Sequence, residues 1–310
     1  MSKIAWTDET WNPIVGCSKV SAGCANCYAE RMAVRLAGMA RPGFGADDIP
    51  PANAPEHYAC VITPGGSWNG TTKLVESALD KPLRWRKPRR VFVCSMSDLF
   101  HESVPDEWVD RVFAVMALCP QHCFQLLTKR PERMLSYMRW AGHPDTVGRT
   151  DRRTKIDGSG HIGNHICGFA NGLSWPFPNV HLGVSVENQQ CADERIPVLL
   201  QTPAAVRFVS LEPMLGPVDL HRSHQLAYDG GARVMSRIDW VVLGCESGSR
   251  RRPCLHEWMV DVVRQCKSAG VPVFVKQVSI DGKVSHDMAE WPAELRVREY
   301  PSRSETTDKH

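Results

Sequence analysis

The feature of this chain that most constrains its fold is a series of short apolar runs that alternate with segments of helical pattern. Most of these runs lack polar and apolar alternation, which is typical of strands covered on both faces of a parallel sheet. The runs are residues 91–94, 123–127, 181–184, 206–209, 240–243 and 271–275, and the helical patterns are 106–118, 131–140, 189–200 and 257–269. The alternation predicts an α/β fold, either a partial or near-complete TIM-like parallel β/α barrel with loop insertions or an open parallel sheet.

Three segments near the N-terminus extend this scheme. Residues 10–15 predict a first strand, although Pro13 cannot donate to a sheet ladder. Residues 28–39 have the periodicity of a helix, and residues 73–80 predict another. The first strand would lead directly into the loop before residue 28.

The chain length allows one large domain or two smaller ones. We expect residues 1–280 to form a single β/α barrel domain with insertions at about 40–70, 141–176 and 222–237. Residues 281–310 would form a C-terminal extension and flexible tail.

Polar residues follow each of the six apolar runs. They are Ser95, Ser97 and Asp98; Thr128, Lys129 and Arg130; Ser185, Glu187 and Asn188; Ser210 and Glu212; Glu246 and Ser247; and Lys276 and Gln277. Taken singly, any of them could cap a helix or form a surface ion pair. Because the carboxyl ends of the strands form the active-site face of a TIM-like barrel, their repetition predicts an enzyme site there.

Three cysteines, Cys17, Cys24 and Cys27, fall within eleven residues of one loop. Thiolate is a soft ligand, so such crowding in a chain without secretory features indicates zinc or iron–sulfur chemistry. Gly16 and Gly23 would allow the loop to wrap a cluster, and the helix that follows Cys27 would direct its N-terminus at an anionic group.

The choice of metal remains open at this point. Structural zinc needs a fourth ligand, which a distant His, Asp or Cys would have to supply. A four-iron four-sulfur cluster on three thiolates would leave one iron free for another ligand. The simplest alternative is that the cysteines are small buried apolar residues or a disulfide with one thiol to spare.

The cysteine loop resembles the cluster site of radical S-adenosylmethionine (SAM) enzymes, although its gaps of six and two residues differ from their usual three and two. Most of residues 1–280 more closely resemble a phage-associated three-cysteine family of unknown function. That resemblance rests on Trp6 to Tyr28 and on the sequences at 95–100, 127–131 and 183–188.

The resemblance to radical SAM enzymes implies a set of cofactors and roles. Cys17, Cys24 and Cys27 would hold a 4Fe-4S cluster, and SAM would be cleaved to a 5′-deoxyadenosyl radical with an electron from an external donor. SAM would be bound by Ser95, Ser97, Asp98, Thr128, Arg130, Ser185, Glu187 and Lys276, while Lys129, Glu212 and Glu246 would act in catalysis. The substrate would be a nucleotide or nucleic acid, as a weaker similarity to spore photoproduct lyase also suggests.

The composition and the N-terminal sequence predict where in the cell the protein is found. The N-terminus lacks the apolar core of a signal peptide and no uncharged apolar run reaches membrane-spanning length, so we expect a cytoplasmic protein without a membrane partner. The twelve cysteines would then be reduced thiols. The net charge of +3 is too small to indicate nucleic-acid binding by itself.

Two short segments allow narrower hypotheses. The basic residues around Trp85 at 81–90 could follow a phosphate backbone, but a solvated connection is the simpler interpretation. His161, His165 and Cys167 resemble half of a zinc site within an otherwise polar loop.

Two other classes of function stay open. One is a non-catalytic, metal-stabilised binding protein holding zinc or an iron–sulfur cluster, and the other is a hydrolase that uses the strand-end carboxylates.

Overall fold

The computed structural model describes residues 4–39, 56–142, 175–222 and 237–301. The insertion at about 40–70 is thus described only from residue 56. Most of the insertions at 141–176 and 222–237, including His161, His165 and Cys167, lies outside the described residues. Among the described residues, no helix has the length and apolar character needed to cross a membrane.

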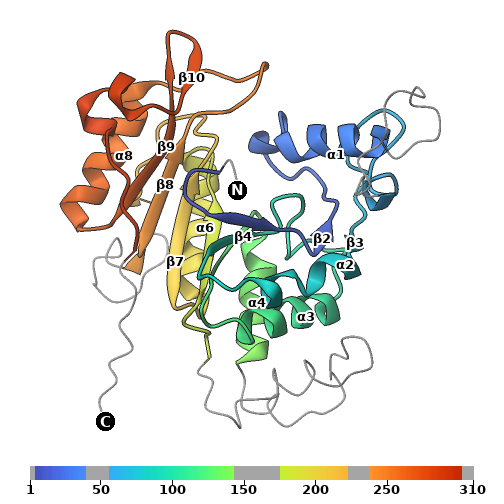
Figure 1. The fold of residues 1–310 in the computed structure, drawn as a ribbon. Helices are drawn as coiled ribbons and strands as arrows, with labels where there is room; N and C mark the ends of the chain where they lie inside the picture. The colour runs from blue at the N-terminus through green and yellow to red at the C-terminus, as the bar shows by residue number, and fades with distance from the viewer. Residues whose placement is uncertain (1–3, 40–55, 143–174, 223–236, 302–310) are drawn as a thin grey trace, which may run out of the picture.

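An eight-stranded, mostly parallel sheet forms the centre of the protein (Figure 1). Its strands, in spatial order, are β1 (Glu9–Trp11), β4 (Arg90–Val93), β5 (Cys123–Thr128), β6 (Val180–Ser185), β7 (Val206–Leu211), β8 (Trp240–Gly244), β9 (Val273–Ile280) and β10 (Lys283–Ser285). The first seven pair in parallel and only β10 is antiparallel. This confirms the predicted α/β fold with a parallel sheet.

The helices between these strands cover one face of the sheet. They are α3 (Asp106–Ala117), α4 (Pro131–Ala141), α6 (Gln189–Gln201) and α8 (His256–Ala269). Because the strands follow each other in one direction, right-handed crossovers place all connecting helices on the same side. The larger apolar core lies between this layer and the sheet.

Smaller elements precede β4. They are β2 (Ile14–Val15), α1 (Tyr28–Met39), β3 (Lys73–Leu74) and α2 (Glu76–Leu79). The strands β2 and β3 form a separate antiparallel pair. Figure 1 shows α1 and α8 on opposite sides of the strands.

The sheet is strongly curved around a second apolar cluster. The Trp6 ring lies 4.9 Å from Phe92 of β4, 6.1 Å from Phe208 of β7 and 5.8 Å from Trp240 of β8, measured between ring centroids. In a flat sheet β4 and β7 would be about 14 Å apart, so one ring could reach both only if the strands curl around it. Gly183 lies against the Phe208 ring, where a Cβ would come within 2.6 Å.

The C-terminal segment occupies the outer edge of β9. Strand β10 pairs with residues 278–280, and backbone bonds join Val297 to Val275 and Glu299 to Val273. Trp291 and Leu295 of this segment are buried. Within the described residues β1 pairs with β4 alone, so no hydrogen bonds close the sheet into a barrel.

Two local predictions need correction. The strand expected at 10–15 is divided at Asn12 and Pro13 into β1 and β2, which belong to different sheets. The helix expected at 73–80 is wrong in its first part, because 73–74 pair as β3 with β2 and only 76–79 are helical. Pairing with a neighbouring strand outweighs the weak helical pattern there. The predicted helix at 28–39 is confirmed.

Candidate functional site

A cavity of about 470 Å³ opens at the carboxyl end of the sheet, and the three cysteines of the N-terminal loop line it. The sequence-predicted residues that also line it are Ser95, Ser97, Asp98, Thr128, Lys129, Arg130, Ser185, Glu212, Glu246 and Lys276. Glu187 is fully buried and reaches the site through Lys129. The structure therefore brings together the residues predicted from the strand ends and the cysteines.

The cysteine loop, residues 16–27, is attached at its beginning to the end of β4. Gly16 pairs with Ser97, whose Oγ donates to the Gly16 carbonyl at 2.6 Å. Gly16 has φ +93°, and a Cβ there would meet the Thr71 carbonyl oxygen at 2.3 Å. Only glycine fits this position without displacing the loop.

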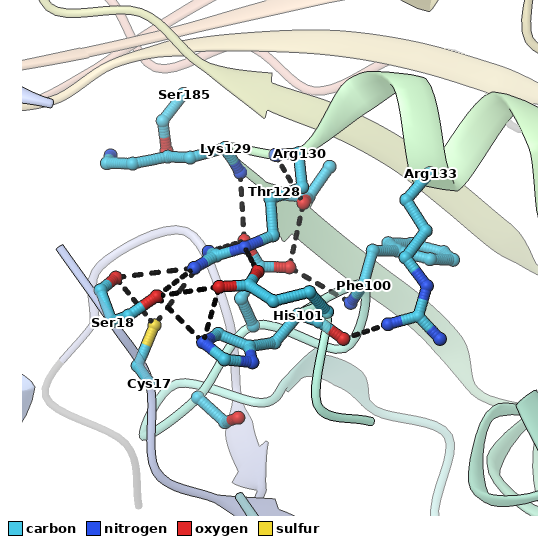
Figure 2. Close-up of polar contacts among 12 residues, drawn as sticks. Cys17, Ser18, Phe100, His101, Thr128, Lys129, Arg130, Arg133 and Ser185 are labelled. Carbon is cyan, nitrogen blue, oxygen red and sulfur yellow. Dashed lines mark hydrogen bonds and ion pairs between the residues drawn. The ribbon is translucent and has the colours of Figure 1, made fainter. Parts of the chain in front are cut away.

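Asp98 is bonded on both carboxylate oxygens. It accepts hydrogen bonds from the amide of Phe100, the hydroxyl of Thr128 and the amide of Lys129, at 2.7–3.0 Å, and forms a 3.1 Å ion pair with Arg130 (Figure 2). With four donors already bound, Asp98 organises the turn after β5. This arrangement suits a positioning residue better than a direct ligand of SAM.

Arg130 connects that turn to the first cysteine (Figure 2). Its guanidinium bonds Asp98, Glu102 at 2.7 Å and Ser18 Oγ at 2.7 Å, and lies 3.9 Å from Cys17 Sγ. Burial lowers the pKa of Arg130, but Asp98 and Glu102 outweigh it and hold the pKa above its ordinary value. A permanent positive charge therefore lies beside the Cys17 sulfur.

His101 supports the same corner of the site and was not predicted from the sequence. Its Nδ1 accepts from the Ser103 amide at 3.1 Å, so the neutral ring carries its proton on Nε2, which donates to Ser18 Oγ at 2.8 Å. Burial lowers the pKa of His101, which favours this neutral form. No motif around 101 signals the role, because it depends on a loop contact to Ser18.

Glu187 holds the middle of the cysteine loop. It forms ion pairs with Lys129 at 2.8 Å and Arg195 at 3.1 Å, and accepts from Ser21 Oγ at 3.0 Å. Burial raises the pKa of Glu187, but these two cations outweigh it and hold the pKa below its usual range. Gly23 lies so close that a Cβ would come within 2.4 Å of the Glu187 side chain.

Glu246 holds the end of the loop in a similar way. It accepts from Asn26 Nδ2 at 3.1 Å and pairs with Arg252 at 2.5 Å. Arg252 also donates to the Ala22 carbonyl at 2.8 Å. Burial raises the pKa of Glu246, but the hydrogen bonds from Arg252 outweigh it and lower the pKa. Arg252 and Asn26 lie in loops away from the predicted strand ends, which is why the sequence did not identify them.

The other polar residues that line the cavity follow β7, lie on β9 or belong to the turn after β4. Glu212 and Lys276 form an ion pair at the cavity. Ser95 Oγ donates to Asn12 at 3.0 Å, and the Ser95 carbonyl accepts from the Tyr28 hydroxyl at 2.6 Å. These contacts tie β1 and α1 to the end of β4.

The inner wall of the cavity is apolar. Ile4, Trp6, Phe92 and Leu127 line it from the interior of the curled sheet. Pockets with an apolar lining and a few convergent polar groups are typical of small-molecule sites, and this volume lies within their usual range. The cavity can thus receive a ligand with one flat apolar part and one charged part.

The cysteines are the candidate ligands for a metal cofactor. Every cysteine in the described residues is a free thiol, and among these residues no group of three or more His, Cys, Asp or Glu side chains could hold a single metal ion. Burial, followed by the Asp98 charge, raises the pKa of Cys17 to about 12, although Arg130 opposes this. Metal binding must therefore displace a proton from Cys17.

The thiol set nevertheless suits an iron–sulfur cluster. Three thiols from one loop face the same cavity, and α1 begins immediately after Cys27, so its unpaired amides lie next to them. Cys94 also lines the cavity, at the end of β4.

The basic stretch at 81–90 lies away from this site, because it precedes β4 and so belongs to the amino end of the sheet. Arg84, Arg89 and Arg90 are ion-paired there with Asp80, Glu9 and Asp8. This position does not favour contact with a ligand in the cavity.

Comparison with known proteins gives one match. Residues 1–300 match the family described as "Protein of unknown function (DUF5131)". No curated protein and no solved structure matches the chain. Because the match covers nearly the whole sequence, the chain belongs to the DUF5131 family of proteins of unknown function.

Proposed function

We propose that this protein is a radical SAM-type iron–sulfur enzyme. The observation that carries the proposal is the common cavity of Cys17, Cys24 and Cys27 and the polar ends of the parallel strands. A cofactor held by the thiols would lie directly beside groups that could bind and orient a second, small ligand. The resemblance of the loop to radical SAM cluster sites supports SAM as that second ligand.

In this proposal Cys17, Cys24 and Cys27 would hold a 4Fe-4S cluster. When bound, the cluster would supply an electron, received from an external donor, for the reductive cleavage of SAM. Arg130 stabilises negative charge on the Cys17 side, and the N-terminus of α1 does so beside Cys27.

The chain's own residues would bind and orient SAM. Lys129 and Lys276 are held by Glu187 and Glu212, so their ammonium groups are fixed near the cavity and available to a carboxylate. The hydroxyls of Ser185 and Ser210 line the same cavity. The apolar wall around Trp6 and Leu127 suits the adenine ring and excludes water from it.

The roles first assigned to the acids change accordingly. Glu246 was expected to act in catalysis, but an ion pair with Arg252 and a lowered pKa make it a weak proton acceptor. Glu212 is likewise engaged with Lys276. Both suit positioning of the cysteine loop and of Lys276 better than proton transfer. The same pairing argues against a hydrolase that depends on these carboxylates.

We also propose that the curled sheet is an incomplete barrel of the TIM-like kind. Its seven parallel strands run in chain order with their helices on one side, as barrel strands do. The segment 283–299 covers the edge of β9, where a closing strand would pair.

The proposal is tested first by metal analysis of cysteine variants. Separate Cys17→Ser, Cys24→Ser and Cys27→Ser variants, reconstituted anaerobically, should lose most of the about four irons expected for each wild-type chain. Cys60→Ser is the matched control, because Cys60 is exposed and does not line the cavity, and it should keep the wild-type content. Wild-type protein that takes up zinc in place of iron and sulfide would instead support the metal-stabilised binding protein.

A further inference from the structure

Helix α1 carries two pairs of exposed side chains, one of which lines the cavity. Tyr28 and Met32, one turn apart, line the cavity and are nevertheless 45% and 43% exposed. Arg31 and Arg35 have the same one-turn spacing and are also exposed. The helix thus has two exposed side chains with apolar surface at the cavity, and two exposed arginines beside them in the sequence.

The loop after β8 adds to this positive charge. The Arg31 guanidinium packs against Gly248, where a Cβ would come within 2.4 Å of it. Arg250 is exposed, and its carbonyl accepts from Asn26 of the cysteine loop at 2.8 Å. Arg31, Arg35 and Arg250, which we call the arginine rim, therefore lie around the junction of α1, the cysteine loop and the β8 loop.

The arginine rim carries uncompensated charge. Within the described part of the chain none of its three side chains forms an ion pair, whereas Arg130, Arg195 and Arg252 inside the site are all paired. Three exposed arginines without an ion-pair partner in the described residues give this part of the surface a positive potential, which would attract an anionic ligand.

We infer that the arginine rim binds the phosphate backbone of a single-stranded nucleic acid and so presents one of its nucleotides to the cavity. This inference rests on the proposed function, whose substrate class it specifies. Arginine is well suited to phosphate, and a one-turn spacing of about 6 Å is comparable with the separation of successive phosphates along a strand. Tyr28 and Met32 would pack against a base, as aromatic and apolar side chains do in single-strand binding sites.

The fixed position of Tyr28 supports its role as a stacking surface. Its hydroxyl donates to the Ser95 carbonyl, which holds the ring in place although nearly half of it is exposed. A nucleoside monophosphate has a single phosphate group, whereas the three arginines belong to two elements, α1 and the loop after β8. The distribution of charge therefore favours a strand over a free nucleotide.

The test is fluorescence anisotropy with a labelled single-stranded oligonucleotide of about 12 nucleotides, in DNA and RNA forms, at several salt concentrations. Three phosphate contacts predict a slope of about −2 for log K against log salt. The variant Arg31→Gln/Arg35→Gln/Arg250→Gln should abolish most of that slope and weaken binding at least about tenfold.

The matched control is Lys81→Gln/Arg86→Gln/Lys87→Gln. These three cations are also exposed and unpaired within the described residues, but they lie in the basic stretch at the other end of the sheet. This control should bind like wild type. The inference would be overturned if both variants lost affinity equally, or if only the control lost affinity. Binding of a free mononucleotide as tightly as the oligonucleotide would also overturn it.

Iron content and SAM binding of the same variants are measured separately. Because the arginine rim does not include the cysteines, the rim variant should load its cluster normally. Wild-type protein that binds the oligonucleotide but holds no cluster would contradict the proposed function while leaving the rim assignment intact. A loaded protein with no affinity for either oligonucleotide would contradict the rim assignment alone.

Discussion

Four acidic side chains at the carboxyl end of the sheet each have a basic partner. They are Asp98 with Arg130, Glu187 with Lys129 and Arg195, Glu212 with Lys276, and Glu246 with Arg252. Buried pairs of this kind do not guarantee stability, but removing one member leaves an uncompensated charge. Glu187 and Glu246 bond the cysteine loop directly, and Asp98 reaches it through Arg130, which indicates that these three acids hold its geometry.

A partly buried histidine at the other end of the interior gives the protein a specific response to acid. His181 of β6 lies beside Cys123, with 3.4 Å between Nε2 and Sγ, and burial lowers its pKa to about 4. The folded protein keeps this ring neutral, whereas an unfolded chain protonates it near pH 6.5. The stability contributed by His181 is therefore present above pH 6.5 and is lost as the pH falls toward 4.

This response can be measured as the change in the free energy of unfolding with pH. Between pH 7 and pH 5, the free energy of unfolding of wild-type protein should fall by about 2 kcal/mol through His181. His181→Gln should remove that part of the slope, while His286→Gln, at an exposed position, should leave it unchanged. Urea denaturation at each pH gives the comparison. An unaltered slope in His181→Gln would show that the ring is not kept neutral by the fold.

At the scale of elements, three strand ends hold the cysteine loop. Ser97 after β4 bonds Gly16, Glu187 after β6 bonds Ser21, and Glu246 after β8 bonds Asn26. These contacts fix the beginning, middle and end of the segment that carries the three thiols. A displacement at one of them should therefore affect the cofactor site as well as the local packing.

Gly23→Ala should produce such a displacement. Its Cβ would collide with the Glu187 side chain, and such overpacking costs about 1–3 kcal/mol. We expect lower stability and reduced iron content after reconstitution, measured by denaturation and metal analysis. Gly216→Ala, whose Cβ meets only an ordinary 3.8 Å contact, should change neither quantity. Wild-type iron content in Gly23→Ala would contradict the idea that Glu187 positions the loop.

At the scale of the whole molecule, the parallel strands, their crossover helices and the convergence of their polar ends were predictable from the sequence. Buried runs such as Val241 to Leu243 have few alternatives to a central strand, and parallel topology brings strand ends together wherever they lie in the chain. The cysteines and eleven strand-end residues could therefore be selected before any contact was known.

What the sequence did not reveal depends on contacts between distant loops. Arg252, Asn26 and His101 act through partners that no local pattern marks. The edge pairing of 297–299 with β9 was also missed, because two of these residues are charged and resemble a solvated tail. Whether the strands close into a barrel depends on such edge contacts, which hydrophobic patterning does not report.

The most direct test of the account is electron paramagnetic resonance of anaerobically reconstituted, dithionite-reduced protein, with and without SAM. We predict a reduced four-iron signal whose shape or g-values change when SAM is added, because a cluster held by three thiolates would leave one iron without a cysteine ligand. A four-iron signal that does not change when SAM is added would contradict the radical SAM assignment. Protein that carries zinc or no metal after reconstitution would contradict it as well.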